Sequence, residues 1–330
     1  MKILAIRFGR LGDVILLIPA LCSLKAAFPD ARLTFLTGHR CAPIAELCPQ
    51  IDEVISVDRI EMRDGPVWRA LGKMTGLIRD IRARNFDLAI DFHSLRETNL
   101  LTWLSGATVR VGMKRYAAPY LGFCFNRPPV LEDKGLHVAE MFQKVAGGVA
   151  NRPPLKSGGG LVVPENLQSW ARQIVPGGRR IVLYADAPVP ERIWPPDRFA
   201  ELADFAMQRL GASVVVLCGT EGKTLADRIR QSSRHTGGLS IFTDVTLPQL
   251  AALIASACLL ISNDTGPMHL GPALGAPTLG LFSVGYPEHF RPTGPQDRFL
   301  RANPIEDIQV KEVIEAVEEM WSTADPGLLR

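Results

Sequence analysis

The sequence predicts an α/β protein made of two doubly wound domains. Short apolar stretches alternate with amphipathic helical stretches along the chain, and this alternation is typical of β–α–β units with a mostly parallel sheet. The segment 151–160, NRPPLKSGGG, interrupts the alternation with a proline pair and three consecutive glycines. With 330 residues, the chain can form two hydrophobic cores of about 150 residues each. We therefore expect domains at 1–155 and 156–330.

The elements of the first domain follow from its apolar runs and the residues that break them. A glycine turn, Gly9-Arg10-Leu11-Gly12, separates the first strand from an amphipathic helix, and Pro29 ends that helix because proline cannot continue it. A basic loop is expected at 113–116. The predicted strands are 2–8, 32–37, 53–57, 86–92 and 109–112, and the long predicted helices are 13–28 and 64–84.

The second domain repeats this pattern after the linker. The predicted strands are 180–184, 214–218, 240–242, 259–262 and 276–282, and the predicted helices are 165–175, 196–210, 223–231, 247–257 and 308–321. We expect the last helix to pack back on the first domain. Ligands of doubly wound sheets bind at the carboxyl ends of the strands, so the loops that follow the strands are the candidate sites.

Composition and charge indicate a globular protein without a nucleic-acid partner. Hydrophobic residues make up 47% of the chain and charged residues 22%, which is typical of a folded protein. The net charge of +3 is compatible with an acidic substrate or a membrane surface, but it does not indicate nucleic-acid binding. Six scattered cysteines without a C-x-x-C pair indicate reduced thiols. Charged residues interrupt the apolar run at the N-terminus, so we expect a cytoplasmic protein without a signal peptide.

The stretch 259–291 carries the strongest local signal for a ligand. A buried strand leads into the turn Asn263-Asp264-Thr265-Gly266, and Pro267 fits the first position of a helix because its missing amide is not needed there. The free amides of a helix N-terminus bind anions, typically phosphate, and His269 faces the same place. The alternative is an ordinary strand–turn–helix corner in which Asp264 or Thr265 caps the helix.

Asp13 is a candidate general base. It follows the glycine turn at the carboxyl end of the first strand and opens the next helix. A carboxylate in this position can accept a proton from an incoming hydroxyl, and the helix N-terminus favours its negative charge. The alternative is a plain helix cap. The position by itself favours the cap.

Other short motifs indicate what the protein is not. The run 219–224, GTEGKT, lacks the glycine that a P-loop has five places before its Gly-Lys pair, so it indicates only a glycine turn. No G-x-G-x-x-G follows the first strand, which argues against a dinucleotide-dependent dehydrogenase. The sequence shows no cluster of histidine and cysteine ligands, so we expect no metal site.

Two stretches together resemble a known family. RFGRLGDVILLIPALCSLKAAFPDARLTFLT and SNDTGPMHLGPALGAPTLGLF are similar to the heptosyltransferases of glycosyltransferase family 9. FDLAIDFH, HVAEMFQKVA, Trp194-Pro195 and the closing helix extend the resemblance over nearly the whole chain. The resemblance implies a GT-B fold, in which two Rossmann-like doubly wound domains face a central cleft. It also implies an inverting enzyme without metal or other cofactor, which transfers heptose from ADP-heptose to the lipopolysaccharide inner core.

The resemblance further implies roles for individual residues. In the first domain, Asp13 deprotonates the acceptor, a hydroxyl of Kdo or of heptose. The second domain binds the ADP-sugar donor, and the candidate donor-binding residues are Arg192, Glu221, Asp264, Thr265, Gly266 and His269. The candidates for binding the anionic acceptor, with a solvated basic rim as the alternative for the charged ones, are Arg59, Arg63, Arg96, Lys114, Arg115 and His137. A peripheral contact with the inner face of the inner membrane is a further expectation.

Three departures from the family pattern concern the donor site. Family members usually have a glycine-containing loop after the strand 180–184 and a lysine two residues before Trp-Pro; here the loop is ADAPVP, and Arg192 takes the place of the lysine. Arg192 keeps a positive charge for a diphosphate, whereas Asp186 adds a negative charge near it. Pro272 should kink the helix after the turn. The alternatives are therefore a nucleotide-sugar-binding protein without transferase activity, or a transferase or epimerase that uses another nucleotide-sugar.

Overall fold

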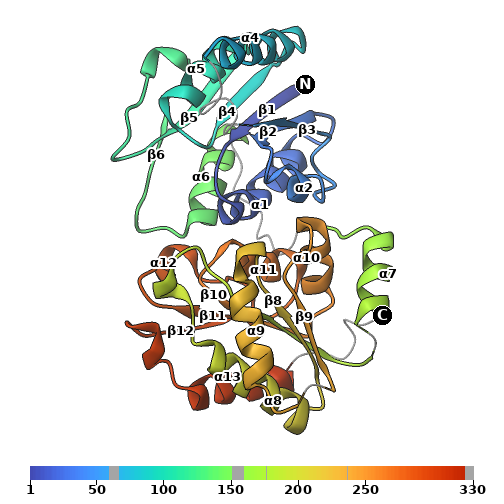
Figure 1. Cartoon of the computed structure of the whole chain (residues 1–330). Helices are drawn as coiled ribbons and strands as arrows, with labels where there is room; N and C mark the ends of the chain where they lie inside the picture. The colour runs from blue at the N-terminus through green and yellow to red at the C-terminus, as the bar shows by residue number, and fades with distance from the viewer. Residues whose placement is uncertain (59–66, 151–159, 176, 236, 324–330) are drawn as a thin grey trace. The chain divides into compact units, whose positions relative to one another are not determined.

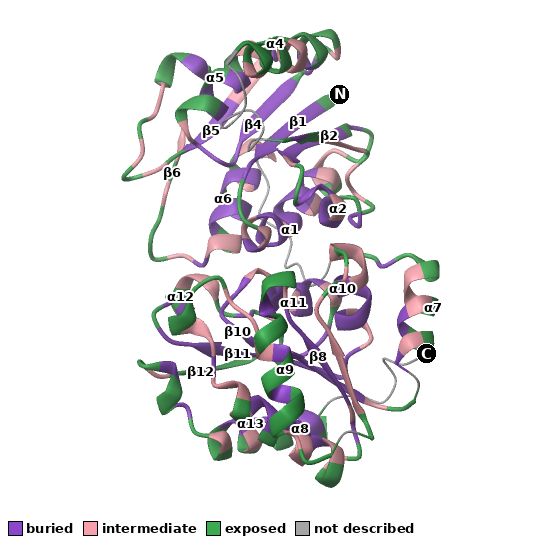
Figure 2. Ribbon diagram, in the orientation of Figure 1, coloured by how far each residue is buried: buried purple, intermediate pink, exposed green. Residues whose placement is uncertain are grey.

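The computed structural model describes residues 1–58, 67–150, 160–175, 177–235 and 237–323. The chain divides into two compact units, Met1–Gly160 and Leu161–Arg330, which we call unit 1 and unit 2 (Figure 1). Each unit holds one six-stranded sheet, and the strand pairs in both sheets are parallel. Helices connect the strands, and the strands are mostly buried (Figure 2). The predicted α/β class with two doubly wound domains is therefore confirmed.

Unit 1 has the strand order β3-β2-β1-β4-β5-β6, so the winding reverses between β1 and β4. Its strands are β1 (Lys2–Arg7), β2 (Arg32–Gly38), β3 (Glu53–Val57), β4 (Leu88–Asp91), β5 (Val109–Lys114) and β6 (Val130–Leu131). Its helices are α1 (Leu11–Ala27), α2 (Ala42–Ala45), α4 (Val67–Ala83), α5 (Arg96–Leu104), the 3₁₀ turn η1 (Gly122–Cys124) and α6 (Val138–Ala150). Because β5 continues through Lys114, half of the expected basic loop is strand.

Burial in unit 1 differs from the expectation at one helix. β1 is buried from Ile3 to Arg7, as expected for a central parallel strand with helices on both faces. The core on one face includes Ile81 of α4. α1 packs against α6 and α2 and is buried on nearly all sides, so it is not the amphipathic helix that we expected. Its apolar residues are covered all round by neighbouring elements, which is why no polar face is needed.

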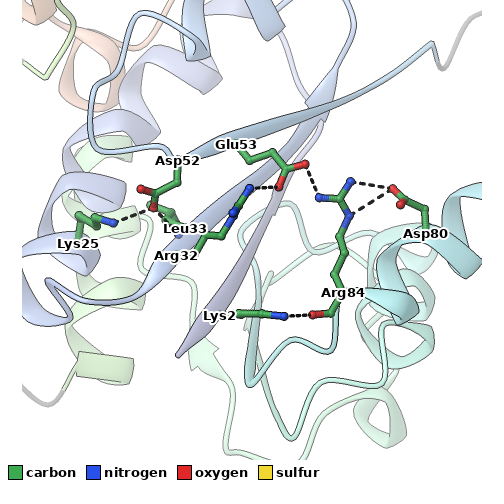
Figure 3. Close-up of polar contacts among 8 residues, drawn as sticks. All are labelled: Lys2, Lys25, Arg32, Leu33, Asp52, Glu53, Asp80 and Arg84. Atoms are coloured by element: carbon green, nitrogen blue, oxygen red, sulfur yellow. Dashed lines mark hydrogen bonds and ion pairs between the residues drawn. The ribbon is translucent and has the colours of Figure 1, made fainter.

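Ion pairs and hydrogen bonds fasten the amino-terminal edge of the unit 1 sheet (Figure 3). Arg84, directly after α4, pairs with Glu53 at the start of β3 and with Asp80, whose Oδ2 lies 3.1 Å from Arg84 Nη2. Lys2 Nζ donates to the carbonyl oxygen of Arg84 at 2.8 Å, so the start of β1 is held as well. The hydrogen bond from Arg84 lowers the pKa of Glu53. Contacts within unit 1 therefore occupy the amino-terminal edge of the sheet. Ligands of doubly wound sheets bind at the opposite edge, where the strands have their carboxyl ends.

Unit 2 has the strand order β12-β11-β10-β7-β8-β9, so its winding reverses between β7 and β10. Its strands are β7 (Arg180–Tyr184), β8 (Ser213–Leu217), β9 (Leu239–Phe242), β10 (Leu259–Asn263), β11 (Thr278–Phe282) and β12 (Arg298–Arg301). Its helices are α7 (Glu165–Ile174), α8 (Pro196–Arg209), α9 (Lys223–Ser232), α10 (Leu247–Ala255), α11 (Leu270–Leu274), α12 (Pro287–Phe290) and α13 (Val310–Thr323). Its 3₁₀ turns are η2 (Pro190–Arg192), η3 (Thr220–Gly222), η4 (Gly266–His269) and η5 (Ile305–Asp307).

The final helix, α13, packs within unit 2. Val313, Val317 and Met320 are buried in the same core cluster as Trp194. Trp194 Nε1 donates to the carbonyl oxygen of Ile308 at 2.9 Å and so anchors the segment that leads into the helix. The apolar face of α13 is thus covered by its own unit. The expectation that this helix packs back on the first domain stays a prediction. Among the described residues, no helix combines the length and the apolar character needed to cross a bilayer.

Candidate active site

In unit 1 the candidate site lies where the winding reverses, at the carboxyl ends of β1 and β4. Arg7 is the last residue of β1 and is only 4% exposed. Its Nη1 donates to the carbonyl oxygen of Phe92, directly after β4, at 2.8 Å. Its guanidinium carbon lies 4.8 Å from the centre of the Phe142 ring of α6. Arg7 therefore bridges the two central strands at the place where doubly wound sheets bind ligands.

Asp13 lies beside Arg7, in the first turn of α1. Its Oδ1 is 2.9 Å from Arg7 Nη2, and its Oδ2 accepts the amide of Arg10 at 3.2 Å. A Cβ at Gly9 would lie 3.0 Å from Oδ2 of Asp13, so glycine gives the carboxylate room to fold back over the turn. The Asp13 side chain is nevertheless 27% exposed. The carboxylate closes the first turn of α1 and also keeps one side open to a substrate.

Burial and the charge of Asp13 act in opposite directions on the pKa of Arg7. Burial lowers the pKa of Arg7, the charge of Asp13 raises it, and the charge of Arg115 lowers it. Arginine nevertheless stays protonated in proteins, so the guanidinium is a permanent buried charge that needs a partner. Asp13 supplies that partner, which gives a physical reason for its fixed orientation.

Three of the candidate acceptor residues lie along the same carboxyl edge of unit 1. Arg96 is exposed as the first residue of α5, which follows β4, and Lys114 is exposed as the last residue of β5. Arg115 follows Lys114, and its Nε lies 3.7 Å from Oε1 of Glu132. The structure thus places three basic side chains near the strand ends where an anionic acceptor would bind. Their role in binding stays a prediction.

The other candidate acceptor residues are placed differently. His137 is buried directly before α6, and its Nδ1 accepts the amide of Ala139 at 3.2 Å. This hydrogen bond caps α6, so His137 has a structural role whether or not it also meets the acceptor. Arg59 and Arg63 lie outside the described residues.

In unit 2, Arg192 and Asp264 meet at the carboxyl ends of β7 and β10. Arg192 Nη1 is 3.0 Å from Asp264 Oδ2 and also donates to the carbonyl oxygen of Asp264 at 3.3 Å. The Asp264 side chain is 7% exposed, whereas that of Arg192 is 29% exposed. Burial raises the pKa of Asp264, and the charge of Arg192 opposes this. Asp264 therefore holds Arg192 in place, and Arg192 is the member of the pair that an anionic ligand can reach.

The carboxylate of Asp186, in the loop after β7, is bound by backbone amides. Its Oδ1 accepts the amide of Ala187 at 2.8 Å, and its Oδ2 accepts the amide of Gly219 at 3.0 Å. A Cβ at Gly222 would lie 2.7 Å from Oδ2, so the glycine turn after β8 is shaped around this carboxylate. The negative charge that departs from the family pattern thus ties the loop after β7 to the GTEG turn, because the amide of Gly219 engages it.

Asn263, the last residue of β10, clamps the same loop at both ends. Its Nδ2 donates to the carbonyl oxygen of Ala185 at 2.9 Å, and its Oδ1 accepts the amide of Trp194 at 3.2 Å. The loop that carries Arg192 is therefore fixed to β10, next to Asp264.

Our sequence analysis missed the roles of Asn263 and Arg7, because their partners are far away along the chain. The only local signal was the place of Asn263 at the start of the N-D-T-G turn.

The segment after Asp264 is a 3₁₀ turn followed by a short helix, which differs from the single helix that we expected. Pro267 is the second residue of η4, and Gly275 ends α11 with a φ of +80°. Pro272 is the third residue of α11, where an amide has no acceptor within the helix, so it does not act as a kink. A helix of five residues has a small dipole. The predicted anion binding therefore has little support from a helix dipole and rests on Arg192 and local amides.

The remaining candidate donor residues share the carboxyl edge of the unit 2 sheet. Thr265 and His269 are buried directly after β10, and Gly266 begins η4. Glu221 is exposed in η3, after β8. The loop after β11 reaches the same place, because a Cβ at Gly285 would lie 2.1 Å from Oδ2 of Asp264. Within the part of the chain that the structure describes, no group of three or more His, Cys, Asp or Glu side chains could hold a metal ion.

Comparison with known proteins identifies the family. Residues 74–318 match glycosyltransferase family 9 (heptosyltransferase). The chain belongs to this family. Lipopolysaccharide heptosyltransferase 3 of Escherichia coli K12 is 23% identical over 290 residues, which cover 85% of this chain and 82% of that protein. As a member of family 9, the chain is a glycosyltransferase.

Solved structures of family 9 share the fold of this chain. The family 9 glycosyltransferase of Veillonella parvula matches with a TM-score of 0.84 and 24% identity, covering 98% of this chain and 97% of that one. E. coli heptosyltransferase WaaC with ADP matches with a TM-score of 0.83 and 20% identity, covering 97% of this chain and 100% of that one. These matches confirm the GT-B fold class, with each unit as one of its Rossmann-like domains.

Proposed function

We propose that this glycosyltransferase moves heptose from ADP-heptose to a hydroxyl of an anionic lipopolysaccharide inner-core acceptor, with Asp13 as general base. The Arg7–Asp13 pair carries this proposal. It holds a carboxylate 2.9 Å from a buried guanidinium, at the ligand edge of the sheet, with 27% of the Asp13 side chain exposed. A general base needs this combination of fixed orientation and access. The name of the E. coli relative and the ADP in the WaaC structure support the substrate classes.

In this proposal unit 1 binds the acceptor and unit 2 binds the donor. The acceptor hydroxyl gives its proton to Asp13 while its oxygen attacks the anomeric carbon of the heptose. The bond from that carbon to the ADP oxygen breaks on the opposite face, so the configuration inverts. Arg192 offsets the negative charge that develops on the departing diphosphate, and Asp264 keeps Arg192 in place. The carboxylate of Glu221 suits the hydroxyls of the ribose.

Calorimetric titration with ADP, UDP and GDP tests the donor site. We expect ADP to bind most tightly and Arg192→Met to weaken ADP binding about 10- to 100-fold, because hydrogen bonds to charged groups contribute about 1.5–3 kcal/mol. Arg228→Met is the matched control, since this arginine of unit 2 pairs with the exposed Asp197 at 2.6 Å. Equal weakening by both variants, or tighter binding of UDP or GDP, would contradict an ADP site at Arg192. Binding of ADP-heptose without turnover on any acceptor would indicate a binding protein instead.

We further propose that the protein works in the cytoplasm and that α4 contacts the inner membrane. Trp68 and Leu71 of α4 are 69% and 64% exposed, although both are large and apolar. Arg79 and Arg82 follow on the same exposed side, because positions 68, 71, 75, 79 and 82 are spaced by three or four residues. Unit 1 carries 22 Lys and Arg residues against 15 Asp and Glu. Figure 2 shows that α4 is largely exposed. Apolar and cationic side chains on one helical face suit the surface of an anionic bilayer.

Sedimentation with lipid vesicles tests this contact. We expect the protein to bind vesicles that contain phosphatidylglycerol and to bind pure phosphatidylcholine vesicles weakly. Replacing Trp68 and Leu71 together by Ala should lower binding about tenfold, because each loses apolar area that the bilayer would cover. Leu131→Ala is the control, since Leu131 of β6 is 62% exposed on the same unit. If both changes lower binding equally, α4 is not the contact surface.

A further inference from the structure

Two cysteines that are distant in the sequence lie together in unit 1. Cys22 is in α1, and Cys48 lies between α2 and β3. Their Sγ atoms are 4.0 Å apart, and both thiols also lie near Oε1 of Gln50, at 3.7 Å from Cys22 and 3.6 Å from Cys48. Cys22 is half-buried, whereas Cys48 is buried. The two sulfurs are therefore in contact, and one of them borders the solvent.

We propose that Cys22 and Cys48 form a redox modification site, which a hydroperoxide oxidises reversibly to an intramolecular disulfide. This inference does not depend on the donor or acceptor assigned above. Closing the bond needs each sulfur to move about 1 Å toward the other, since an S–S bond is about 2.05 Å long.

The surroundings of the pair favour a thiolate at Cys48. The hydrogen bond with Cys22 lowers the pKa of Cys48, burial opposes this, and the amides of Gln50 and Ile51 lower it further. The same hydrogen bond and burial raise the pKa of Cys22. The thiolate is the form of cysteine that attacks an oxidant. In the proposal Cys48 is the nucleophile, and the half-buried Cys22 beside it borders the solvent.

The chemistry balances with hydrogen peroxide as the oxidant. The Cys48 thiolate attacks one peroxide oxygen, the O–O bond breaks, and hydroxide leaves, so that Cys48 becomes a sulfenic acid. The Cys22 sulfur then attacks the sulfenic sulfur; its proton joins the departing hydroxide as water. The first hydroxide takes up the proton that Cys48 released when it ionised, so both sulfurs together lose two electrons and the peroxide is reduced to two water molecules. A dithiol reductant restores both thiols.

The cysteine pair lies next to two features of unit 1: the helix that carries Asp13 and the end of the unit at Gly160. α1 carries Asp13 in its first turn and Cys22 further along, so a disulfide would tie this helix to the segment before β3. Gly160, the last residue of unit 1, has a φ of +124°, and a Cβ there would lie 3.2 Å from Cys22 Sγ. The chain that leaves unit 1 therefore passes directly over the sulfur. Oxidation would move Cys22 Sγ toward Cys48 and so change its contact with the backbone at Gly160.

Peroxide treatment of the full chain tests the proposal. After oxidation, alkylation and tryptic digestion without reductant, we expect a peptide pair that joins Cys22 to 41–59 and lacks two hydrogens. Dithiothreitol should abolish it. Because trypsin leaves Cys41 and Cys48 on one peptide, the variant Cys41→Ser identifies the partner: it should keep the link, and Cys48→Ser should lose it. The oxidised wild-type protein should also melt at a higher temperature, because the link restricts the unfolded chain.

Two results would overturn the proposal. One is a peroxide-treated protein in which all six cysteines are still alkylated, since every cysteine is free in the structure. The other is a link that persists in Cys48→Ser, or one that forms only between two chains. Cys258→Ser is a further control: it removes a buried cysteine of unit 2 and should leave the Cys22–Cys48 link unchanged. The main measurement, the cross-linked peptide pair after peroxide treatment, is made on the wild-type protein. The outcome therefore does not depend on how well a variant folds.

Discussion

Asp13→Asn is expected to lower kcat of glycosyl transfer by about 10²- to 10⁴-fold, because the amide cannot take the proton of the acceptor hydroxyl. Asparagine has nearly the same shape and keeps one oxygen that can accept a hydrogen bond from Arg7 or Arg10. ADP affinity should stay close to that of the wild-type protein, whereas the free energy of unfolding should fall, because Arg7 loses its charged partner. The measurement is steady-state kinetics with both substrates varied, together with ADP titration of the same preparation.

The matched control for Asp13→Asn is Asp30→Asn, at an exposed aspartate beyond the end of α1. It makes the same chemical change in the same part of the unit and should leave kcat unchanged. A wild-type kcat in Asp13→Asn would remove Asp13 as the base and leave it only the role of closing the first turn of α1. A loss of ADP binding equal to the loss of kcat would also contradict the proposal, because it would place Asp13 in the donor site.

Arg7→Met should have the second largest effect, lowering kcat by about 10²-fold with little change in the KM of either substrate. Methionine removes the guanidinium 2.9 Å from Asp13 and its hydrogen bond to Phe92, so the carboxylate loses its orientation. A displacement of about 1 Å in a catalytic group can lower the rate about 10²-fold. Arg7→Lys should recover part of kcat, since it keeps the charge but cannot make both contacts. Steady-state kinetics of both variants are the measurement.

Replacing a buried arginine can also lower kcat only because it destabilises the fold. The control is therefore another buried arginine, away from the proposed site. Arg180 of β7 is likewise 4% exposed and hydrogen-bonds to the carbonyl oxygen of Val175. Arg180→Met should lower the free energy of unfolding without lowering kcat at temperatures where the protein is folded. If Arg7→Met and Arg180→Met change kcat and stability in the same proportion, Arg7 has no positioning role.

Much of the fold was predictable because its signals are local. Parallel strands covered on both faces appear in the sequence as uninterrupted apolar runs, such as 259–262, which is most of β10. Glycine and proline mark the turns between elements for steric reasons that depend on a few neighbouring residues. Asp13 and the N-D-T-G turn were found in the same way, since each lies where the chain passes from a strand to a helix.

The rest of the site could not be predicted, because it depends on contacts across the sheets. In KILAIRF, Arg7 is only the polar end of an apolar run; its role appears once β4 brings the Phe92 carbonyl, 85 residues away, within 2.8 Å. The sequence suggested that Asp186 would oppose a diphosphate, and the structure shows its carboxylate bound to Gly219, 33 residues away. Cys22 and Cys48 are 26 residues apart and meet only after α1 and α2 pack.

The sequence by itself determined the fold class, the order of the elements and the residues that follow the strand ends, since local periodicity and turn chemistry set all three. The tertiary structure alone decided which charges pair, which loops are clamped and which thiols meet. Such pairings form when parallel strands from distant parts of the chain align their carboxyl ends, and no local pattern of residues records which strands will be neighbours.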